Sequence, residues 1–248
     1  MQIVTTNILN PLEKAVVIIP TIGSEETRKA IESVLSQTHP TTCYVICDGE
    51  EYWDKTKEIT SDYLSNENFK SCYLPVNVGA KGFYGHRIYA AFSHLVNEKY
   101  ILFLDPDCWF ENNHVESCTK SIEEKNLKWS YSLRKIYDKE GNFVCNDDCE
   151  SLGKWKAWTD CNLIDTNSYC ITREIMIKLT PIWHGGWGAD REFLSDLMQH
   201  FPNYECTGLY TSNYRLGGNP GSVTKEFFQQ GNKVMNDFYR GNFPWRKN

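Results

Sequence analysis

The stretch Tyr100-Ile-Leu-Phe-Leu-Asp105-Pro-Asp107 decides the fold of this 248-residue chain. Five apolar or aromatic residues in succession predict a strand buried on both faces, as central strands of a parallel sheet are. Two carboxylates directly follow this strand. In open α/β sheets, ligands bind beyond the carboxyl ends of the strands. The stretch therefore predicts both a parallel sheet and a polar site at its edge.

Three earlier stretches repeat this order of an apolar strand followed by a polar or glycine-containing turn. They are Ala15-Val-Val-Ile-Ile-Pro20 before Thr21-Ile-Gly23, residues 42–47 before Asp48-Gly49, and residues 69–74 before Asn77-Val-Gly79. Helices are expected between the strands, at residues 24–37, 54–64 and 88–96. This alternation predicts an α/β domain with a mostly parallel twisted sheet flanked by helices. All four strand ends should then point into one crevice.

The second half of the chain is less regular. We expect a hairpin at residues 127–137 and 142–144, and a return to the sheet at 163–171. Helices are expected at residues 172–179, 190–200 and 222–239. Because no linker or repeat separates the halves, we predict a single domain, 1–248. Its first half, residues 1–110, is of the nucleotide-binding type, and its second half, residues 111–248, is irregular.

Composition narrows the class of protein. Lys and Arg number 26 against 32 Asp and Glu, so the formal net charge is −6, which argues against a general nucleic-acid binder. The start of the chain shows no signal peptide, and no apolar run approaches the length of a membrane span. We therefore expect a soluble, cytoplasmic protein with reduced thiols. A zinc site made of Cys145, Cys149, Cys161 and Cys170 is the alternative, which the absence of a CxxC pair disfavours.

The Asp-x-Asp pair suggests a cation site. Asp105 and Asp107 repel each other unless a cation or hydrogen-bond donors lie between them. Mg²⁺ or Mn²⁺, held by one or two carboxylates together with substrate phosphates, is the usual solution. The alternative is a solvated turn in which an Asp caps the following helix and Pro106 is an ordinary turn residue.

The ordered motifs of the first 110 residues resemble the family 2-type glycosyltransferases with the GT-A fold. The resemblance is carried by Val17-Ile-Ile-Pro-Thr21, Ser33-Val-Leu-Ser-Gln-Thr38, Asp48, Asn77-Val-Gly79, Arg87 and Leu102-Phe-Leu-Asp-Pro-Asp107. Two later segments match more weakly, Ile164-Asp-Thr-Asn-Ser-Tyr-Cys-Ile-Thr-Arg-Glu174 and Gly185-Gly-Trp-Gly-Ala-Asp190-Arg-Glu-Phe-Leu194.

The resemblance implies residues that bind a nucleotide-sugar donor. They are the main chain of Pro20, Thr21, Ile22 and Gly23 at the nucleotide, Asp48 at the base, Asn77, Gly79 and Arg87 beside nucleotide and sugar, and Asp105 at the ribose or sugar. Asp107 is the implied main metal ligand, with Asp105 as the second. Arg215, Lys225 or a helix starting near Ser222 could add positive charge at the diphosphate. The glycine-rich residues 213–222 are either a lid over the donor or an ordinary connection.

The implied reaction is transfer of a hexosyl or pentosyl group to an acceptor hydroxyl, with inversion. Asp190 is the implied general base, with Glu192 and Asp165 as runners-up, and a helix N-cap is its alternative role. The expected donor is a UDP-sugar, with GDP as the alternative. The acceptor is expected to be a glycan or glycoconjugate. Competing interpretations are a sugar nucleotidyltransferase, disfavoured by the acidic residues 20–26, and a non-catalytic binding relative.

Tryptophan points to the acceptor. Seven of the eight Trp follow Asp105, and sugars stack their C–H faces on aromatic rings. The candidates for acceptor contact are Trp155, Trp158, Trp183, His184 and Trp187. Each Trp could equally pack in the core. Three features depart from the family pattern: Gly49-Glu-Glu-Tyr-Trp53 follows the base-binding Asp, Ala189 precedes Asp190, and no His follows His200 to serve as a further metal ligand.

Overall fold

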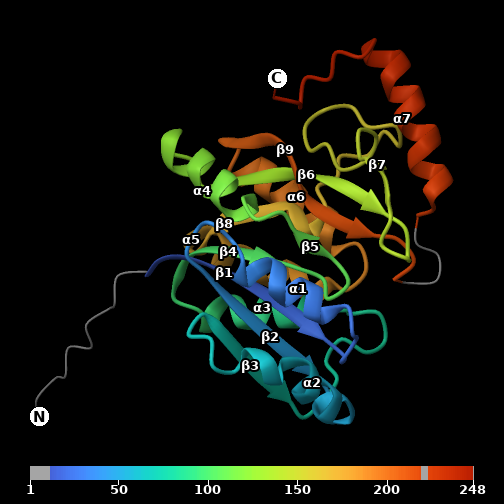
Figure 1. The fold of residues 1–248 in the computed structure, drawn as a ribbon. Helices are drawn as coiled ribbons and strands as arrows, with labels where there is room; N and C mark the ends of the chain where they lie inside the picture. Colours follow the sequence, from blue (N-terminus) through green and yellow to red (C-terminus); the bar gives the residue numbers. More distant parts are fainter. Residues whose placement is uncertain (1–11, 219–222, 248) are drawn as a thin grey trace, which may run out of the picture.

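The computed structural model describes residues 12–218 and 223–247, which form one nine-stranded sheet flanked by helices (Figure 1). The order of the strands is β3-β2-β1-β4-β8-β6-β9-β5, with β7 paired to β6. The four strands of the first half run parallel to one another: β1 (Leu12–Thr21), β2 (Thr41–Asp48), β3 (Phe69–Leu74) and β4 (Glu98–Phe103). Their carboxyl ends therefore meet at one edge of the sheet, as the sequence predicts.

The second half extends this sheet with mixed pairing. Strand β8 (Tyr169–Thr172) is antiparallel to both of its neighbours, β4 and β6 (Trp129–Tyr137). Strand β9 (Tyr204–Arg215) runs parallel to β6, while β5 (Trp109–Phe110) and β7 (Phe143–Asn146) are short antiparallel edges. Strand β8, paired with β4 on one side and β6 on the other, thus joins the two halves into one sheet.

Two apolar cores cover the two faces of the sheet, and β1 contributes to both. Val16 and Ile18 belong to the core that includes residues of α3, α5, α6 and α7, whereas Val17 and Ile19 belong to the core under α1, α2 and α4. Successive side chains of a strand point to opposite faces, so a continuous apolar run is buried from both sides. The helices are α1 (Thr27–Leu35), α2 (Trp53–Thr60), α3 (His86–Leu95), α4 (His114–Glu124), α5 (Arg173–Leu179), α6 (Ala189–His200) and α7 (Lys225–Tyr239). Short 3₁₀ turns occupy Glu50–Tyr52, Ser61–Tyr63, Thr166–Ser168 and Thr180–Gly185.

The structure confirms the predicted strands of the first half and the hairpin of β6 and β7, but it corrects two points. Helix α4 and strand β9 were not predicted. Of residues 213–222, considered either as a lid or as an ordinary connection, Asn213, Tyr214 and Arg215 are no loop at all, because they are the end of β9 and Asn213 is fully buried. Residues 219–222, including Ser222 at the expected helix start, lie outside the described residues, and α7 begins at Lys225.

None of the helices in the described residues is both long and apolar enough to cross a membrane. All ten cysteines are free. Cys149 and Cys170 are fully buried. Within residues 12–218 and 223–247, no group of three or more His, Cys, Asp or Glu side chains could hold a metal ion, so the four cysteines considered as a zinc site do not form one there.

Candidate active site

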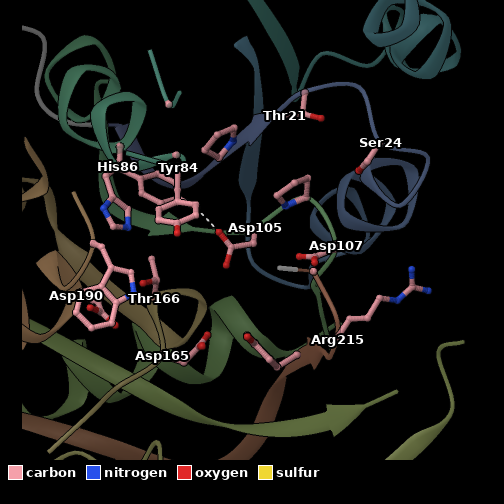
Figure 2. A pocket seen from close by; sticks show the side chains of 18 of the residues that line it. Thr21, Ser24, Tyr84, His86, Asp105, Asp107, Asp165, Thr166, Asp190 and Arg215 are labelled. Carbon is pink, nitrogen blue, oxygen red and sulfur yellow. Dashed lines mark hydrogen bonds between the residues drawn. The ribbon is translucent and has the colours of Figure 1, made fainter. Parts of the chain in front are cut away.

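A cavity of about 890 Å³ opens at the carboxyl ends of β1, β2 and β4 and is lined by both halves of the chain. Figure 2 shows Asp105 near its centre, with His86 and Asp190 to one side and Asp107 and Arg215 to the other. The expected donor residues that line it are Pro20, Thr21, Ile22, Asp48, Asn77, Gly79, Asp105 and Arg215. Asp107, Asp190 and Trp187 line the same cavity. The parallel sheet therefore brings together residues that lie up to 195 positions apart, from Pro20 to Arg215.

Asp48 at the end of β2 holds the loop that follows β3. Its two carboxylate oxygens accept hydrogen bonds from the backbone N–H groups of Val78 (2.7 Å) and Gly79 (2.8 Å). A Cβ atom at position 79 would lie 2.0 Å from the carbonyl oxygen of Tyr84, so only glycine fits there. Burial raises the pKa of Asp48, and the two N–H groups oppose that rise. A carboxylate has further lone pairs, so Asp48 can still accept a bond from a base.

Two expected donor residues do not line the cavity. The guanidinium of Arg87 stacks 3.4 Å from the centroid of the Phe83 ring and donates to the carbonyl oxygen of Val78 (3.3 Å). Arg87 therefore braces the loop of residues 78–83 from behind and does not reach into the pocket. Gly23 adopts a positive φ of 74° in the turn after β1, where its N–H donates to the hydroxyl of Thr21. Its role is to shape that turn.

Asp105 is held firmly from two sides. Its Oδ1 accepts from the hydroxyl of Tyr89 (2.9 Å) and its Oδ2 from the side-chain amide of Asn167 (3.1 Å), while its own N–H donates to Asn167 Oδ1. Burial, together with the charges of Asp107 and Asp165, raises the pKa of Asp105 to about 7. Both oxygens are thus engaged and fixed in orientation, which suits a group that contacts a sugar or ribose hydroxyl.

Asp107 is open toward the cavity by comparison. Its only hydrogen bond from another side chain in the described residues is the weak one from the thiol of Cys108 (3.6 Å). A Cβ atom at position 218 would lie 2.5 Å from Asp107 Oδ2, so the backbone of Gly218 approaches this oxygen closely and a side chain there would collide with it. Burial raises the pKa of Asp107, and the nearby positive charge of Arg215 opposes the rise. A carboxylate that lines the cavity and receives only a weak bond from another side chain of the described residues fits a hard divalent cation.

Arg215 and Lys225 lie on this side of the cavity. Arg215 ends β9 and forms an ion pair with Glu26 (3.2 Å), so its guanidinium is held beside the turn after β1. Lys225 lines a smaller neighbouring cavity of about 260 Å³, together with Lys139. Of these two predicted residues, Arg215 lines the main cavity, whereas Lys225 lines the smaller one beside it.

A buried cluster of charged side chains, which the sequence does not reveal, lines the cavity from the second half of the chain. Arg134 on β6 donates from Nε to Asp147 (2.7 Å) and from Nη1 to Asp165 (2.7 Å), and its Nη2 binds Glu150. The Arg134 side chain is 3% exposed. Asn167 joins the cluster to Asp105 because its amide also donates to Asp165 Oδ1 (2.8 Å). Asp165 is consequently tied to a guanidinium, which disfavours it as a general base.

Asp190 stands in the first turn of α6, two residues after the N-cap Gly188, whose φ is 90°. It is half-buried, and its carboxylate is 3.9 Å from the guanidinium of Arg191. Across the cavity wall, the Nδ1 atom of His86 lies 2.9 Å from the carbonyl oxygen of Gly186, four residues before Asp190. A partly exposed carboxylate at the cavity is free to accept a proton from a bound hydroxyl group.

The aromatic candidates separate sharply. Trp187 lines the cavity and is 77% exposed. Trp183 is wrong as an acceptor contact because it is fully buried, packed against Phe193 and Phe103. Trp158 packs on Phe227, with ring centroids 4.8 Å apart. Neither Trp158 nor the exposed His184 is among the residues that line the cavity, so Trp187 is the candidate that the structure places there.

Trp155 likewise lies outside the cavity lining, with its ring centroid 6.0 Å from that of Trp245. The site residues missed by sequence reasoning are Tyr89, His86, Asn167, Arg134 and Glu150. A tyrosine two positions after the expected Arg87 carries no signal of its role, since its hydrogen bond to Asp105 depends on how α3 packs on the sheet.

An α/β sheet with an Asp-x-Asp turn at its edge and a further carboxylate across the cavity is the arrangement that the resemblance to nucleotide-sugar transferases implies. Comparison with known proteins agrees. The family model for glycosyl transferase family 2 matches residues 16–197, and the chain belongs to this family. An uncharacterized glycosyltransferase of Rickettsia bellii (strain RML369-C) is 33% identical over 141 residues, which cover 53% of this chain and 18% of that relative.

Solved structures of TarS from S. aureus share the fold. TarS 1-349 superposes with a TM-score of 0.58 at 18% identity, covering 82% of this chain and 60% of that one. TarS 1-349 in complex with UDP-GlcNAc superposes with a TM-score of 0.60 at 16% identity, covering 90% of this chain and 66% of that one. The fold is therefore the GT-A fold. This chain spans less than two thirds of the length of each of these proteins.

Proposed function

We propose that the protein transfers a sugar from a nucleotide-diphospho sugar to an acceptor hydroxyl group in a metal-dependent reaction with inversion. The observation that carries the proposal is the pair of carboxylates at one cavity: Asp107, which receives only the weak side-chain bond of Cys108 in the described residues, and Asp190, partly exposed on the other wall. The first suits the diphosphate end of a donor and the second suits the acceptor end. Membership of glycosyl transferase family 2 supports this reading over a sugar nucleotidyltransferase.

The donor is a UDP-sugar in this proposal, with a GDP-sugar as the alternative. A structural neighbour was solved with UDP-GlcNAc and another with UDP, which supports a uridine nucleotide. Asp48, beside the turn of Thr21 and Ile22, offers a carboxylate to the N–H of a base. In this proposal, the space between Asp105 and Asp190 selects the transferred sugar, which is a hexosyl or a pentosyl group.

Asp107 would hold Mn²⁺ or Mg²⁺, with Asp105 as the second carboxylate and donor phosphates completing the ligand set. A divalent cation bound there stabilises the negative charge that develops on the leaving diphosphate. Arg215 adds positive charge on the same side of the cavity. Tyr89 and Asn167 keep Asp105 from rotating, so the two carboxylates stay aligned at the end of β4.

Asp190 would remove the proton of the acceptor hydroxyl as its oxygen attacks the anomeric carbon. One C–O bond forms to the acceptor, the C–O bond to the β-phosphate breaks, and the electron pair leaves on the nucleoside diphosphate. A single displacement of this kind inverts the anomeric configuration. Trp187, exposed at the same wall, supports a glycan or glycoconjugate as the acceptor. Free cysteines throughout support a cytoplasmic, reducing location.

Thermal-shift measurements with UDP, GDP and UDP-GlcNAc, with and without Mn²⁺, test this function. A ligand that binds only the folded state raises the melting temperature. We expect a shift with UDP or UDP-GlcNAc that depends on Mn²⁺ and is lost in Asp107→Ala but kept in the matched surface variant Asp237→Ala. Asp190→Asn should keep donor binding and lower the release of UDP from UDP-GlcNAc by about 10²–10⁴-fold. Binding without metal, or no binding of any nucleoside diphosphate, would contradict the proposal.

A further inference from the structure

His86 lies at the cavity on the same side as Asp190, and the proposed reaction does not yet use it (Figure 2). It is the first residue of α3, half-buried, and follows the tight loop that begins at Gly79. Its ring packs edge-on against Trp183, with centroids 5.1 Å apart, and faces Tyr84 at 6.0 Å. The imidazole is therefore fixed in position rather than free to rotate.

The hydrogen bond to Gly186 assigns the tautomer. A carbonyl oxygen only accepts, so the Nδ1 atom of His86, 2.9 Å away, carries the proton. Burial lowers the pKa of His86, although the charge of the nearby Asp190 acts to raise it. The ring is therefore neutral at pH 7. In a neutral ring with Nδ1 protonated, Nε2 is an acceptor. Within the described residues, no hydrogen bond reaches His86 Nε2.

We propose that His86 is an acceptor-binding residue whose Nε2 accepts a hydrogen bond from a second hydroxyl group, next to the one that Asp190 deprotonates. This inference rests on the proposed function. His86 Nε2 and the carboxylate of Asp190 are two hydrogen-bond acceptors on one wall, and Asp190 is the proposed general base. Together they match two neighbouring hydroxyl groups of an acceptor. A saccharide satisfies both at once, whereas an alcohol with one hydroxyl leaves Nε2 to water and so gains one hydrogen bond fewer from the protein. Water, with two O–H bonds, can satisfy both groups as a minimal acceptor.

The contact with Gly186 gives His86 a second role, which must be separated from the first. Gly186 has a φ of 77°, and a Cβ there would lie 3.3 Å from the carbonyl oxygen of Gly82. The loop before Asp190 is thus packed on the loop before α3, and His86 Nδ1 joins them. The side-chain amide of asparagine can imitate Nδ1, and that of glutamine can reach the place of Nε2. His86→Asn and His86→Gln therefore divide the two roles.

The first test is the tautomer, read by ¹⁵N NMR of the histidine rings with His86→Gln as the assignment control. We expect a neutral ring with Nδ1 protonated at pH 7. The second test is release of UDP from UDP-GlcNAc into water, with Mn²⁺ present. His86→Ala and His86→Asn should each lower the rate by about tenfold with unchanged UDP affinity, whereas His86→Gln should retain more of it.

The third test compares 1,2-propanediol with 1-propanol as added acceptors. In the wild-type protein, the diol should accelerate UDP release more than the mono-alcohol, and His86→Ala should remove that difference. A ring with Nε2 protonated, or a wild-type rate in both His86→Ala and His86→Asn, would overturn the assignment. If His86→Asn kept the wild-type rate and His86→Gln lost it, His86 would act only by holding the two loops together through Nδ1. Failure of the wild-type protein to bind any nucleoside diphosphate would instead refute the proposed function, whereas protonation of Nε2 would refute the role of His86 even if the proposed function holds.

Discussion

The two walls of the cavity are built in different ways. On the first wall, Asp48, Asp105 and Asp107 follow the ends of parallel strands, and each is placed by the strand that precedes it. On the second wall, Asp165 precedes a 3₁₀ turn and Asp190 lies in the first turn of α6, and a buried ion cluster around Arg134 holds Asp165 in place. The first wall depends on backbone pairing, whereas the second depends on contacts between side chains far apart in the chain.

This difference predicts where single substitutions act most strongly. Removing a polar partner on the second wall should lower the free energy of unfolding more than the equivalent substitution on the first wall. A buried charge that loses its partner is costly, whereas strand pairing does not depend on any one side chain. The substitutions below are ordered by their expected effect on the free energy of unfolding.

The largest effect is expected for Arg134→Ala. It leaves Asp147, Asp165 and Glu150 without their shared cation in a buried place, at a cost of about 3–5 kcal/mol. Urea unfolding monitored by tryptophan fluorescence measures the loss. The control is Arg28→Ala, whose ion pairs with Glu25 and Asp62 are screened by solvent, so its loss should be much smaller. Similar losses of unfolding free energy in both variants would contradict the special importance of the buried cluster.

Trp183→Ala should cost a comparable amount, about 3–5 kcal/mol, because it empties a fully buried site in the larger core. Trp187→Ala, at a residue 77% exposed, should change the free energy of unfolding by about 0.5 kcal/mol or less. The same Trp187→Ala should weaken transfer to a saccharide acceptor without changing donor binding. If Trp187→Ala destabilised the fold as much as Trp183→Ala, its assignment to the cavity would be wrong.

Asp48→Ala on the first wall should have an intermediate effect. It leaves the N–H groups of Val78 and Gly79 without acceptors, which costs about 1–3 kcal/mol. Because the loop carrying Asn77 then loses its anchor, the affinity for UDP should fall as well. Chemical denaturation and a UDP titration measure the two effects. Unchanged affinity in a folded Asp48→Ala protein would contradict its place at the nucleotide.

The smallest effect is a dependence of stability on pH. Burial lowers the pKa of His114 to about 3, and its ring stacks on Phe110 with centroids 3.8 Å apart. The unfolded chain binds this proton near pH 6.5 and the folded protein does not, so stability falls as the pH falls below 6.5. Between pH 7 and pH 5.5 the loss from this group is about 1 kcal/mol. His114→Gln should be less sensitive to pH over this range, and an equal slope in both proteins would refute the assignment.

The sequence predicted the first wall well because each of its strands is a continuous apolar run closed by a recognisable turn. It missed β9, which has polar residues buried inside it: Thr207, Thr211, Ser212 and Asn213. A strand of that composition shows no apolar run to detect. The cavity residues Asp105, Asp107 and Asp190 were predicted from motifs and lie where the motifs indicated. Their roles stay predictions.

Orientation within the site could not be predicted. Asp105 is held by Asn167, 62 residues away, and His86 contacts Gly186, 100 residues away. No local pattern carries such pairs, because they arise only when the two halves close on one sheet. The same applies to tryptophan, whose excess after Asp105 suggested an acceptor wall although Trp183 is core and Trp187 faces the cavity.

By itself, the sequence determined the parallel sheet and the row of polar groups at its edge, since both follow from short-range alternation of apolar strands and turns. Only the tertiary structure decided which carboxylate is open and which is engaged. Asp105 and Asp107 are two residues apart, yet Tyr89 and Asn167 donate hydrogen bonds to the first, whereas the second is approached by the backbone of Gly218, where a side chain would collide with it. That distinction comes from partners on three other segments, and packing alone brings them together.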